Sequence, residues 1–196
     1  MIYLRVDGCV FRFAVVATGK RQIMALHVPG ALLNLQNLFL NEIDHDIEAL
    51  IPTTIALISR GAMRGLLEAQ PRIAMRLWHQ TFIDAAIFRK WLVGVGRRSA
   101  YARVAHLMCE FFARMTAAGL SRGMTCDFPL TQLELGDALG LSTVHINRTI
   151  KQLDRDGLLT VHANSLTICD WPRLQEVADF DPAYLELVEP TVPRQQ

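Results

Sequence analysis

Residues 130–142 of the chain read LTQLELGDALGLS, and they contain the signals for the start of one helix, its end and the start of a second. Thr131 and Glu134 have the spacing of a capping box, in which each side chain accepts a hydrogen bond from a free N–H group at the helix start. Gly140 can adopt the left-handed conformation that ends a helix. Ser142 is a favoured residue just before a new helix. The stretch therefore predicts two short helices joined by a tight turn.

The residues that follow extend this pattern. The second helix is expected to cover Ser142–Arg155 and to end at Asp156-Gly157. Two β runs come next, Leu158–His162 and Ser165–Asp170, around the turn dipeptide Ala163-Asn164. A helix, turn, helix and hairpin in this order are typical of a winged helix-turn-helix that binds duplex DNA. An ordinary helical hairpin is the alternative, and the hairpin after the second helix weighs against it.

The second helix is predicted to turn a polar face toward DNA. Ile146, Ile150 and Leu153 follow at spacings of four and three, so they are expected to point inward. The residues expected to contact base edges are Thr143, Val144, His145, Asn147 and Arg148. Arginine can pair with a guanine edge and asparagine with an adenine edge. The residues expected to contact phosphates are Thr131, Ser142 and Lys151. A solvated polar face is the alternative.

A long apolar helix is predicted upstream, over residues 72–95, with two apolar stripes. At 1.5 Å per residue it would be about 36 Å long, more than a small domain can bury. One stripe is therefore expected to pack on the chain itself and the other on a second copy. The residues expected at the dimer contact are Ile73, Leu77, Phe88, Trp91 and Val95. A fully buried core helix is the alternative. Gly94 and Gly96 are expected to end this helix, and another to begin near Ser99.

The N-terminal region reads as strands. Residues 3–6, 10–16 and 22–28 are rich in β-formers, and Pro29-Gly30 closes the third run. A polar stretch then precedes a further strand at residues 53–58. The predicted fold class is α+β, with a partial antiparallel β-roll, a long dimerisation helix and a C-terminal winged helix-turn-helix domain. The expected parts are a truncated cyclic-nucleotide-binding-like β-roll over 1–70, the dimerisation helix over 71–96, the DNA-binding domain over 97–170, and a C-terminal helix and tail over 171–196.

Composition limits the function classes. Of the 196 residues, 51% are hydrophobic and 20% are charged, which is an ordinary globular profile. No apolar run approaches the roughly 20 residues that a membrane span needs, so a cytoplasmic protein without membrane contact is expected. The net charge of +1 means that DNA contact must come from a few placed cations. No phosphate loop, nucleophile elbow or paired catalytic carboxylates occur, so the sequence predicts no enzyme, no catalytic residue and no cofactor.

Cysteine and histidine spacing predicts no metal site. The four cysteines, Cys9, Cys109, Cys126 and Cys169, are scattered and are expected to be buried thiols. The triplet Asp44-His45-Asp46 has metal-ligating residue types, but adjacent residues of a strand point in opposite directions, which favours a hydrated loop.

Taken together, these motifs resemble the Crp/Fnr family of bacterial transcription regulators over nearly the whole chain. The resemblance rests on the shortened β-roll, Pro29-Gly30, the long helix, residues 130–142 and the run RTIKQL at 148–153. It implies a homodimer on a two-fold-related operator, with the second helix in the major groove, and RNA polymerase as a further partner. Family members often carry Arg-Glu after the serine, whereas this chain has Thr143-Val144 and keeps only Arg148. The usual operator preference is therefore not expected.

The sensor half also departs from the family. Its cyclic-nucleotide-binding members hold a phosphate with a Gly-Glu-Leu segment and a downstream Arg-Ser pair. Here Leu33-Asn34-Leu35 and Asp44-His45 stand at those places, and the Asp44 carboxylate would repel a phosphate. Cyclic-nucleotide binding is therefore not expected, and the effector stays unassigned. Two other functions remain open: a truncated family member that dimerises with and modulates a related regulator without an operator of its own, and a small-molecule-binding module with a vestigial DNA domain.

Overall fold

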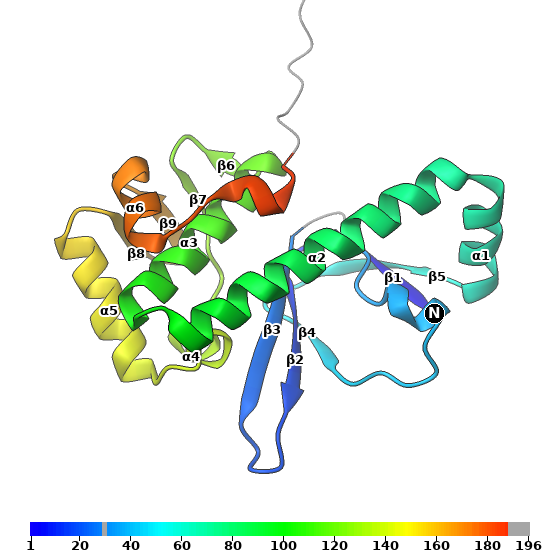
Figure 1. Ribbon diagram of the computed structural model, residues 1–196, viewed down its shortest axis with the longest axis horizontal. Coiled ribbons are helices and arrows are strands. Elements are labelled where there is room, and N and C mark those ends of the chain that lie inside the picture. Colours follow the sequence, from blue (N-terminus) through cyan, green and yellow to red (C-terminus); the bar gives the residue numbers. More distant parts are fainter. Residues whose placement is uncertain (29–30, 188–196) are drawn as a thin grey trace, which may run out of the picture.

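The computed structural model describes residues 1–28 and 31–187. The predicted Pro29-Gly30 turn and residues 188–196 of the predicted tail lie outside the described residues. A single long helix crosses the molecule, with small β-sheets toward one end and a compact helical domain at the other (Figure 1). The α+β fold class is confirmed.

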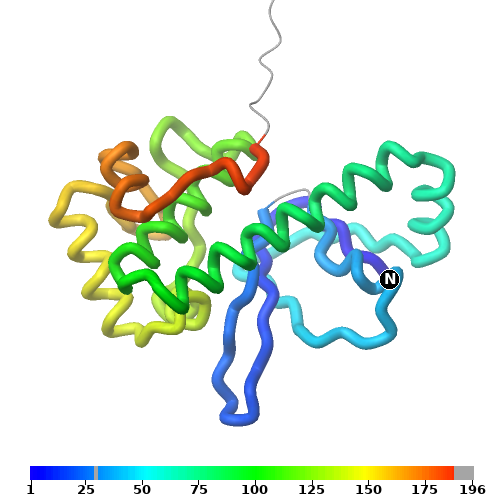
Figure 2. Tube along the Cα trace, in the orientation of Figure 1, coloured from blue at the N-terminus to red at the C-terminus, as the bar shows by residue number. Residues whose placement is uncertain are grey.

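The N-terminal part contains two small antiparallel sheets. In one, β1 (Ile2–Asp7) pairs with β5 (Thr54–Ile58); in the other, β2 (Val10–Val15) lies between β3 (Arg21–His27) and β4 (Asp46–Ala49). A 3-10 turn, η1 (Leu35–Leu38), and the helix α1 (Arg60–Ala69) complete this part. Figure 2 shows the β2–β3 hairpin, in blue, projecting away from the long green helix. Strand β4 was not predicted. Its sequence, DIEA, is short and half acidic, so the sequence indicated only a polar stretch there.

The long helix, α2 (Pro71–Arg97), has 27 residues and continues through both glycines that were predicted to end it. That prediction is wrong. The Nη2 atom of Arg103 donates hydrogen bonds to the carbonyl oxygens of Val95, at 2.9 Å, and Arg98, at 3.1 Å. The last carbonyl groups of α2 are therefore satisfied by a side chain from the next helix, and this offsets the poor helix propensity of Gly94 and Gly96.

The C-terminal part is built around α3 (Ala100–Ala117), which begins at Ser99 as predicted. Its nine residues from Val104 to Phe112 are all buried. The surrounding elements are β6 (Ser121–Arg122), β7 (Thr125–Asp127), α4 (Gln132–Leu139), α5 (Thr143–Arg155), β8 (Leu159–His162), β9 (Ser165–Ile168), α6 (Trp171–Ala178) and η2 (Pro182–Leu185). The four strands form one antiparallel sheet in the order β6-β7-β9-β8. One apolar core continues from β2 and β3 past α2 into this part.

A buried carboxyl group joins four segments of the chain. Glu110 in α3 is 1% exposed and accepts hydrogen bonds from Trp91 Nε1 of α2, at 3.1 Å, and from the Tyr184 hydroxyl of η2, at 2.8 Å. Arg114 pairs with Glu110 at 3.4 Å and donates to the carbonyl oxygen of Leu26 in β3 at 2.8 Å. Burial raises the pKa of the Glu110 carboxyl, and the charge of Arg114 opposes this.

His106 lies beside this carboxyl group. The ring is stacked on Tyr184, and its Nδ1 lies 3.1 Å from the carbonyl oxygen of Ala178 at the end of α6. Burial lowers the pKa of His106 to about 4, with a further contribution from the charge of Arg98. The imidazole is therefore neutral at pH 7.

Acidification should destabilise the fold through His106. Between pH 6.5 and pH 4 the unfolded chain binds a proton that the folded chain does not, so stability that is present above pH 6.5 is lost as the pH falls through 4. The shift corresponds to about 3 kcal/mol. Urea denaturation at a series of pH values should show that the free energy of unfolding falls less steeply with decreasing pH in His106→Gln than in the original chain. The exposed His162→Gln is the matched control, and equal slopes in all three proteins would contradict this assignment.

Gly136 on α4 sets how closely α4 approaches the start of α5. A Cβ atom at this residue would lie 2.6 Å from the carbonyl oxygen of Leu141, so the backbone would have to move. Gly136→Ala should therefore destabilise the chain by about 1–3 kcal/mol, as overpacked core substitutions do. Gly65→Ala in α1, which has open space around it, should be neutral or stabilising by up to about 1 kcal/mol. Denaturation midpoints of the two variants test this difference. An unchanged midpoint for Gly136→Ala would rule out the close approach of α4 to the start of α5.

Candidate DNA interface

The start of α4 is fixed by the predicted capping box, which is confirmed. The hydroxyl of Thr131 accepts from the N–H of Glu134 at 3.3 Å, and the Glu134 carboxylate accepts from the N–H of Thr131 at 2.6 Å. The Thr131 hydroxyl also lies 2.6 Å from that carboxylate. This hydroxyl was expected to contact a phosphate, and in the structure it already has partners within the cap. At the other end, Gly140 has φ 65° and ends α4 as predicted.

The inner face of α5 anchors it to the domain. Ser142 caps the helix, since its hydroxyl accepts from the N–H of His145 at 3.3 Å. Ile146 and Leu153 are fully buried, and Thr149 between them is also buried. Ile150 is half-buried and packs against the same core. The inward set predicted from the spacing is therefore observed, with Thr149 added to it.

The outer face of α5 is open to solvent. Thr143, Arg148 and Lys151 are exposed, and Val144 is 78% exposed, whereas His145 and Asn147 are half-buried. Neither Arg148 nor Lys151 forms an ion pair with another described residue. The first turn of α5 carries no acidic side chain, so its free N–H groups and positive helix end are available to an anion.

Arg155 belongs to the same outer face and was not among the predicted site residues. It is exposed, it lies four residues after Lys151, and its Nε donates to the carbonyl oxygen of Lys151 at 3.2 Å. Positions 144, 148, 151 and 155 therefore form one stripe along the helix. The spacing was visible in the sequence, but Arg155 was taken only as the last residue of the helix.

The predicted wing is observed as the hairpin β8–β9. Ala163 and Asn164 have φ values of 48° and 61°, the left-handed pair that a two-residue hairpin turn requires. His162, Ala163 and Asn164 are exposed. The hairpin and α5 lie at the end of the molecule that is remote from β1 and β5 (Figure 1).

The residues predicted for dimer contact occupy different environments. Trp91 is 9% exposed and donates to Glu110, so it belongs to the core of its own chain and is not available for the dimer contact at which it was expected. Leu77 is half-buried against the small cluster around Met63. Ile73, Phe88 and Val95 remain exposed. The stripe that contains Trp91 faces the chain because the core of α3 lies on that side.

A second set of apolar side chains on α2 is more exposed. Its members fall on one side of the helix by its period: Met75, Trp78, Phe82, Leu92 and Val93. Phe82, for example, is 63% exposed, and its ring packs edge-on against Trp78. The sequence showed two stripes without indicating which one the chain itself covers. We call these five residues the α2 outer face.

The remaining predictions concern the Asp44-His45-Asp46 triplet, membrane spans and the cysteines. The Asp44 carboxylate lies 2.8 Å from His45 Nδ1, and His45 Nε2 lies 2.9 Å from the Gln36 amide. Among the described residues no cluster of histidine, cysteine and carboxylate side chains could hold a metal ion. No described helix is both long and apolar enough to span a membrane. Three cysteines are buried as predicted, whereas Cys169 is exposed, which corrects the expectation for that residue.

Comparison with known proteins finds a matching domain model and several similar proteins. A sequence model of the Crp-like helix-turn-helix domain matches residues 102–177. The transcriptional activator FnrL of Cereibacter sphaeroides is 28% identical over 167 residues, which are 83% of this chain and 66% of FnrL. The nitrogen fixation regulation protein FixK of Bradyrhizobium diazoefficiens is 23% identical over 90% of this chain and 73% of its own length. This chain thus spans just under two thirds of FnrL.

Solved structures share the fold. FixK2 from Bradyrhizobium japonicum superposes with a TM-score of 0.77 at 25% identity, over 90% of this chain and 86% of FixK2. A CRP-family transcriptional regulator from Thermus thermophilus superposes with a TM-score of 0.70 at 18% identity, over 91% and 88% of the two chains.

FnrL is named a transcriptional activator and FixK a regulation protein, in agreement with the expectation that this chain is not an enzyme. The helix-turn-helix match covers α3 through α6, and the structural similarity extends to α2 and the β-sheets. The chain therefore contains a Crp-like helix-turn-helix domain at residues 102–177, and over most of its length it is similar to regulators such as FnrL and FixK2.

Proposed function

We propose that this chain is a sequence-specific regulator of transcription that binds a two-fold-related DNA operator as a homodimer. The observation that carries the proposal is the division of α5 into two faces. Its inner face is locked by Ile146, Thr149 and Leu153, while its outer face leaves Arg148 and Lys151 without an ion-pair partner among the described residues. A rigid helix with free cations on its outer side has the form that enters a major groove.

The residues of α5 divide by role. Arg148 has the length and the planar fork to hold a guanine edge, and Val144 can touch a thymine methyl group. Thr143, His145 and Asn147 complete the base-reading set. Ser142, Lys151 and the N-terminal amide groups of α5 fit phosphates, which position the helix without reading sequence. Thr131 would contact a phosphate only if its hydroxyl turned away from Glu134.

The α2 outer face supports the homodimer. Large apolar side chains exposed on one side of a helix mark an interaction surface, and a second copy offers the same face in return across a two-fold axis. Phe88 and Val95 border this face, whereas Ile73 lies on the same side of α2 as Trp91, about five turns before it. In the assembly, the sensor part would be residues 1–70 and the dimerisation helix residues 71–96. The DNA-binding domain would be residues 97–170, followed by a C-terminal segment over 171–196. Such a regulator would act in the bacterial cytoplasm and would meet RNA polymerase at promoters.

Two substitutions in α5 should separate the residue that reads bases from the residue that positions the helix on phosphates. Arg148→Ala should cost about 1–3 kcal/mol on the preferred site and relax the preference at one base pair of each half-site. Lys151→Ala should weaken binding to all sequences equally and reduce the salt slope by about one unit, because a phosphate contact releases counterions. Binding isotherms on matched and single-substituted duplexes at several salt concentrations measure both effects. If Arg148→Ala weakened all duplexes equally, the arginine would be a phosphate contact instead.

The dimer is tested on the α2 outer face. Phe82→Glu and Leu92→Glu place a charge in the proposed contact, and each should weaken self-association at least about tenfold. Light scattering should give twice the 22.0 kDa chain mass for the original protein and a mass nearer 22.0 kDa for these variants. Val15→Glu, at an equally exposed apolar residue of the β2–β3 hairpin, is the control and should remain dimeric. A monomeric original protein at micromolar concentration would refute the homodimer.

A further inference from the structure

The last described segment of the chain, residues 179–187, touches both α2 and α3. It includes η2, and Figure 1 shows it in red beside the long green helix. Phe180 and Leu185 are buried, and both belong to the core that surrounds α3. We call residues 179–187 the C-terminal strap. Its apolar side chains anchor it to the C-terminal part of the molecule.

The strap is fixed to one face of α3 by its two aromatic side chains. The Tyr184 hydroxyl donates to the Glu110 carboxylate at 2.8 Å, and the Tyr184 ring is stacked on His106 at a centroid distance of 6.2 Å. The ring of Phe180 packs edge-on against the same histidine, with centroids 5.3 Å apart. His106 and Glu110 are four residues apart, so they lie on the same side of α3. These contacts hold the strap firmly on α3.

The strap also contacts the C-terminal half of α2. The Asp179 carboxylate accepts a hydrogen bond from Nη2 of Arg98, the residue that follows α2, at 3.2 Å. The Lys90 ammonium group lies 5.3 Å from the centre of the Tyr184 ring, within the range of a cation–π contact. Tyr184 therefore contacts both helices, α3 through its hydroxyl group and α2 through its ring.

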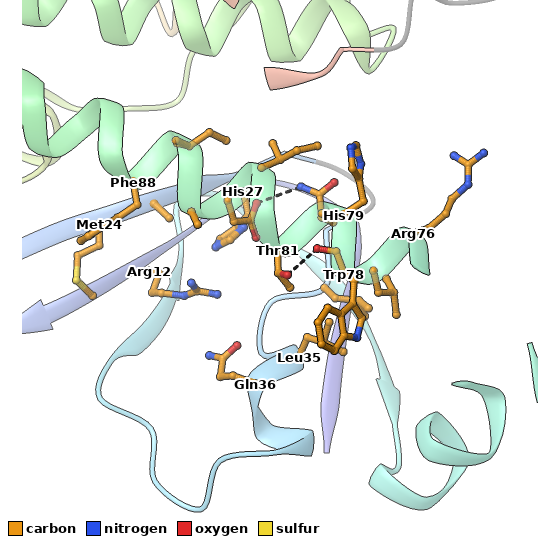
Figure 3. Close-up of a pocket in the computed structure, with 18 of the residues that line it drawn as sticks. Arg12, Met24, His27, Leu35, Gln36, Arg76, Trp78, His79, Thr81 and Phe88 are labelled. Atoms are coloured by element: carbon orange, nitrogen blue, oxygen red, sulfur yellow. Dashed lines mark hydrogen bonds between the residues drawn. The ribbon is translucent and has the colours of Figure 1, made fainter. Parts of the chain in front are cut away.

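A third contact lies farther along α2. The Glu186 carboxylate is 3.8 Å from His79 Nε2. In the view of Figure 3, His79 extends from α2 on the side opposite Gln36. The contacts of the strap with the long helix therefore begin at residue 98 and reach back to residue 79. A segment that follows a helix over this length constrains the direction of the helix axis.

The strap and the side of α2 that it follows have opposite charges. The strap contains three acidic side chains and no basic one. By the helix period, the side of α2 that faces it carries the basic side chains of Arg72, Arg76, His79, Lys90 and Arg97. Asp84 is the only acidic residue of α2, and by the same period it faces another side. Charge complementarity thus holds the strap on α2, whereas apolar burial holds it on α3.

The angle between α2 and α3 has a consequence for DNA binding. In the proposed homodimer α2 lies at the two-fold axis, and α3 packs against α5. A change in this angle therefore moves each α5 relative to the axis and changes the distance between the two copies. One additional base pair between half-sites separates them by about 3.4 Å more and rotates them by about 36°. A dimer with a fixed angle accepts one spacing and discriminates against its neighbours.

We propose that the C-terminal strap holds the angle between α2 and α3 and thereby sets the half-site spacing that the dimer accepts. This inference rests on the proposed function, a homodimer on a two-fold-related operator. The strap contacts no base, so it acts as a positioning segment. Without its hold on α2, the two helices remain joined through Glu110 and Arg103, and the protein stays folded with a more variable angle.

Three simultaneous substitutions release the strap from α2 and keep its anchors on α3: Asp179→Asn, Glu186→Gln and Lys90→Met. Asparagine tolerates the left-handed φ of 47° at residue 179. The matched control makes the same three exchanges at exposed residues that form no ion pair with another described residue: Asp46→Asn, Glu68→Gln and Lys20→Met. Both triple variants change the net charge equally. Circular dichroism checks that both are folded.

Spacing selectivity is measured with the full chain on duplexes that carry the preferred operator, the same operator with one base pair more or one fewer between half-sites, and an isolated half-site. The original chain and the control should prefer the correct spacing at least about tenfold, and the strap variant less than about threefold. Affinity for the isolated half-site should agree within about twofold in all three proteins. Equal spacing selectivity in the three proteins would overturn the proposal.

Hydrogen exchange of the free proteins tests the strap without DNA. Amide groups of residues 94–103, where α2 meets α3, should exchange at least about threefold faster in the strap variant than in the original chain and the control, because fewer contacts oppose local opening. Exchange in α4 and α5 should be unchanged. Equal exchange at residues 94–103 in the three proteins would refute the role of the strap. Faster exchange there, in a chain that binds no operator, would contradict the proposed function and leave the hold on the angle intact.

Discussion

The carboxyl group of Glu110 is buried where the long helix crosses α3, and the arrangement of the molecule depends on its hydrogen bonds. Trp91 of α2 and Tyr184 of η2 donate to it, and so does Arg114, which lies in α3 like Glu110. A buried carboxyl group is costly unless its oxygens are bonded, so these partners are held in one geometry. The angle between α2 and α3 is thereby fixed. Since α3 packs against both α5 and α6, the orientation of the candidate recognition helix follows from it.

Two further polar contacts hold the helix-turn-helix against the rest of the chain. Arg21 of β3 donates to Asp137 of α4 at 2.8 Å and to Glu48 of β4 at 2.9 Å, and it lies over the ring of Phe11. Gln22 donates to the carbonyl oxygen of Ala138 at 3.1 Å. The β2–β3 hairpin therefore contacts α4 directly. The N-terminal sheets and the helix-turn-helix part share one continuous core and are not two bodies joined by a linker.

Arg103 provides the remaining connection. Besides satisfying the end of α2, it donates to the carbonyl oxygen of Leu139 at 2.6 Å, at the last residue of α4. One guanidinium group thus joins the end of the long helix to the turn of the helix-turn-helix. In the proposed homodimer, a movement of α2 would reach this turn in part through Arg103.

Local signals made the DNA-binding half predictable. The capping box at Thr131, the turn at Gly140 and the wing turn at Ala163-Asn164 each depend on neighbouring residues, and all three are observed. Features that depend on distant residues were missed or misplaced. The continuation of α2 past Gly94 depends on Arg103, and the core position of Trp91 depends on Glu110. A cavity lined by Arg12, His27 and residues of α2 forms only when β2, β3 and α2 come together, so no local pattern indicated it.

In the proposed homodimer, two copies of α5 read a DNA site with two-fold symmetry. The most direct test is selection of bound duplexes from a random library by the purified chain, followed by sequencing. The enriched sites should contain two inverted half-sites, with centres about 10–10.5 base pairs apart or at a multiple of that spacing. Enrichment of a single asymmetric half-site, or no enrichment by a folded and dimeric protein, would contradict it.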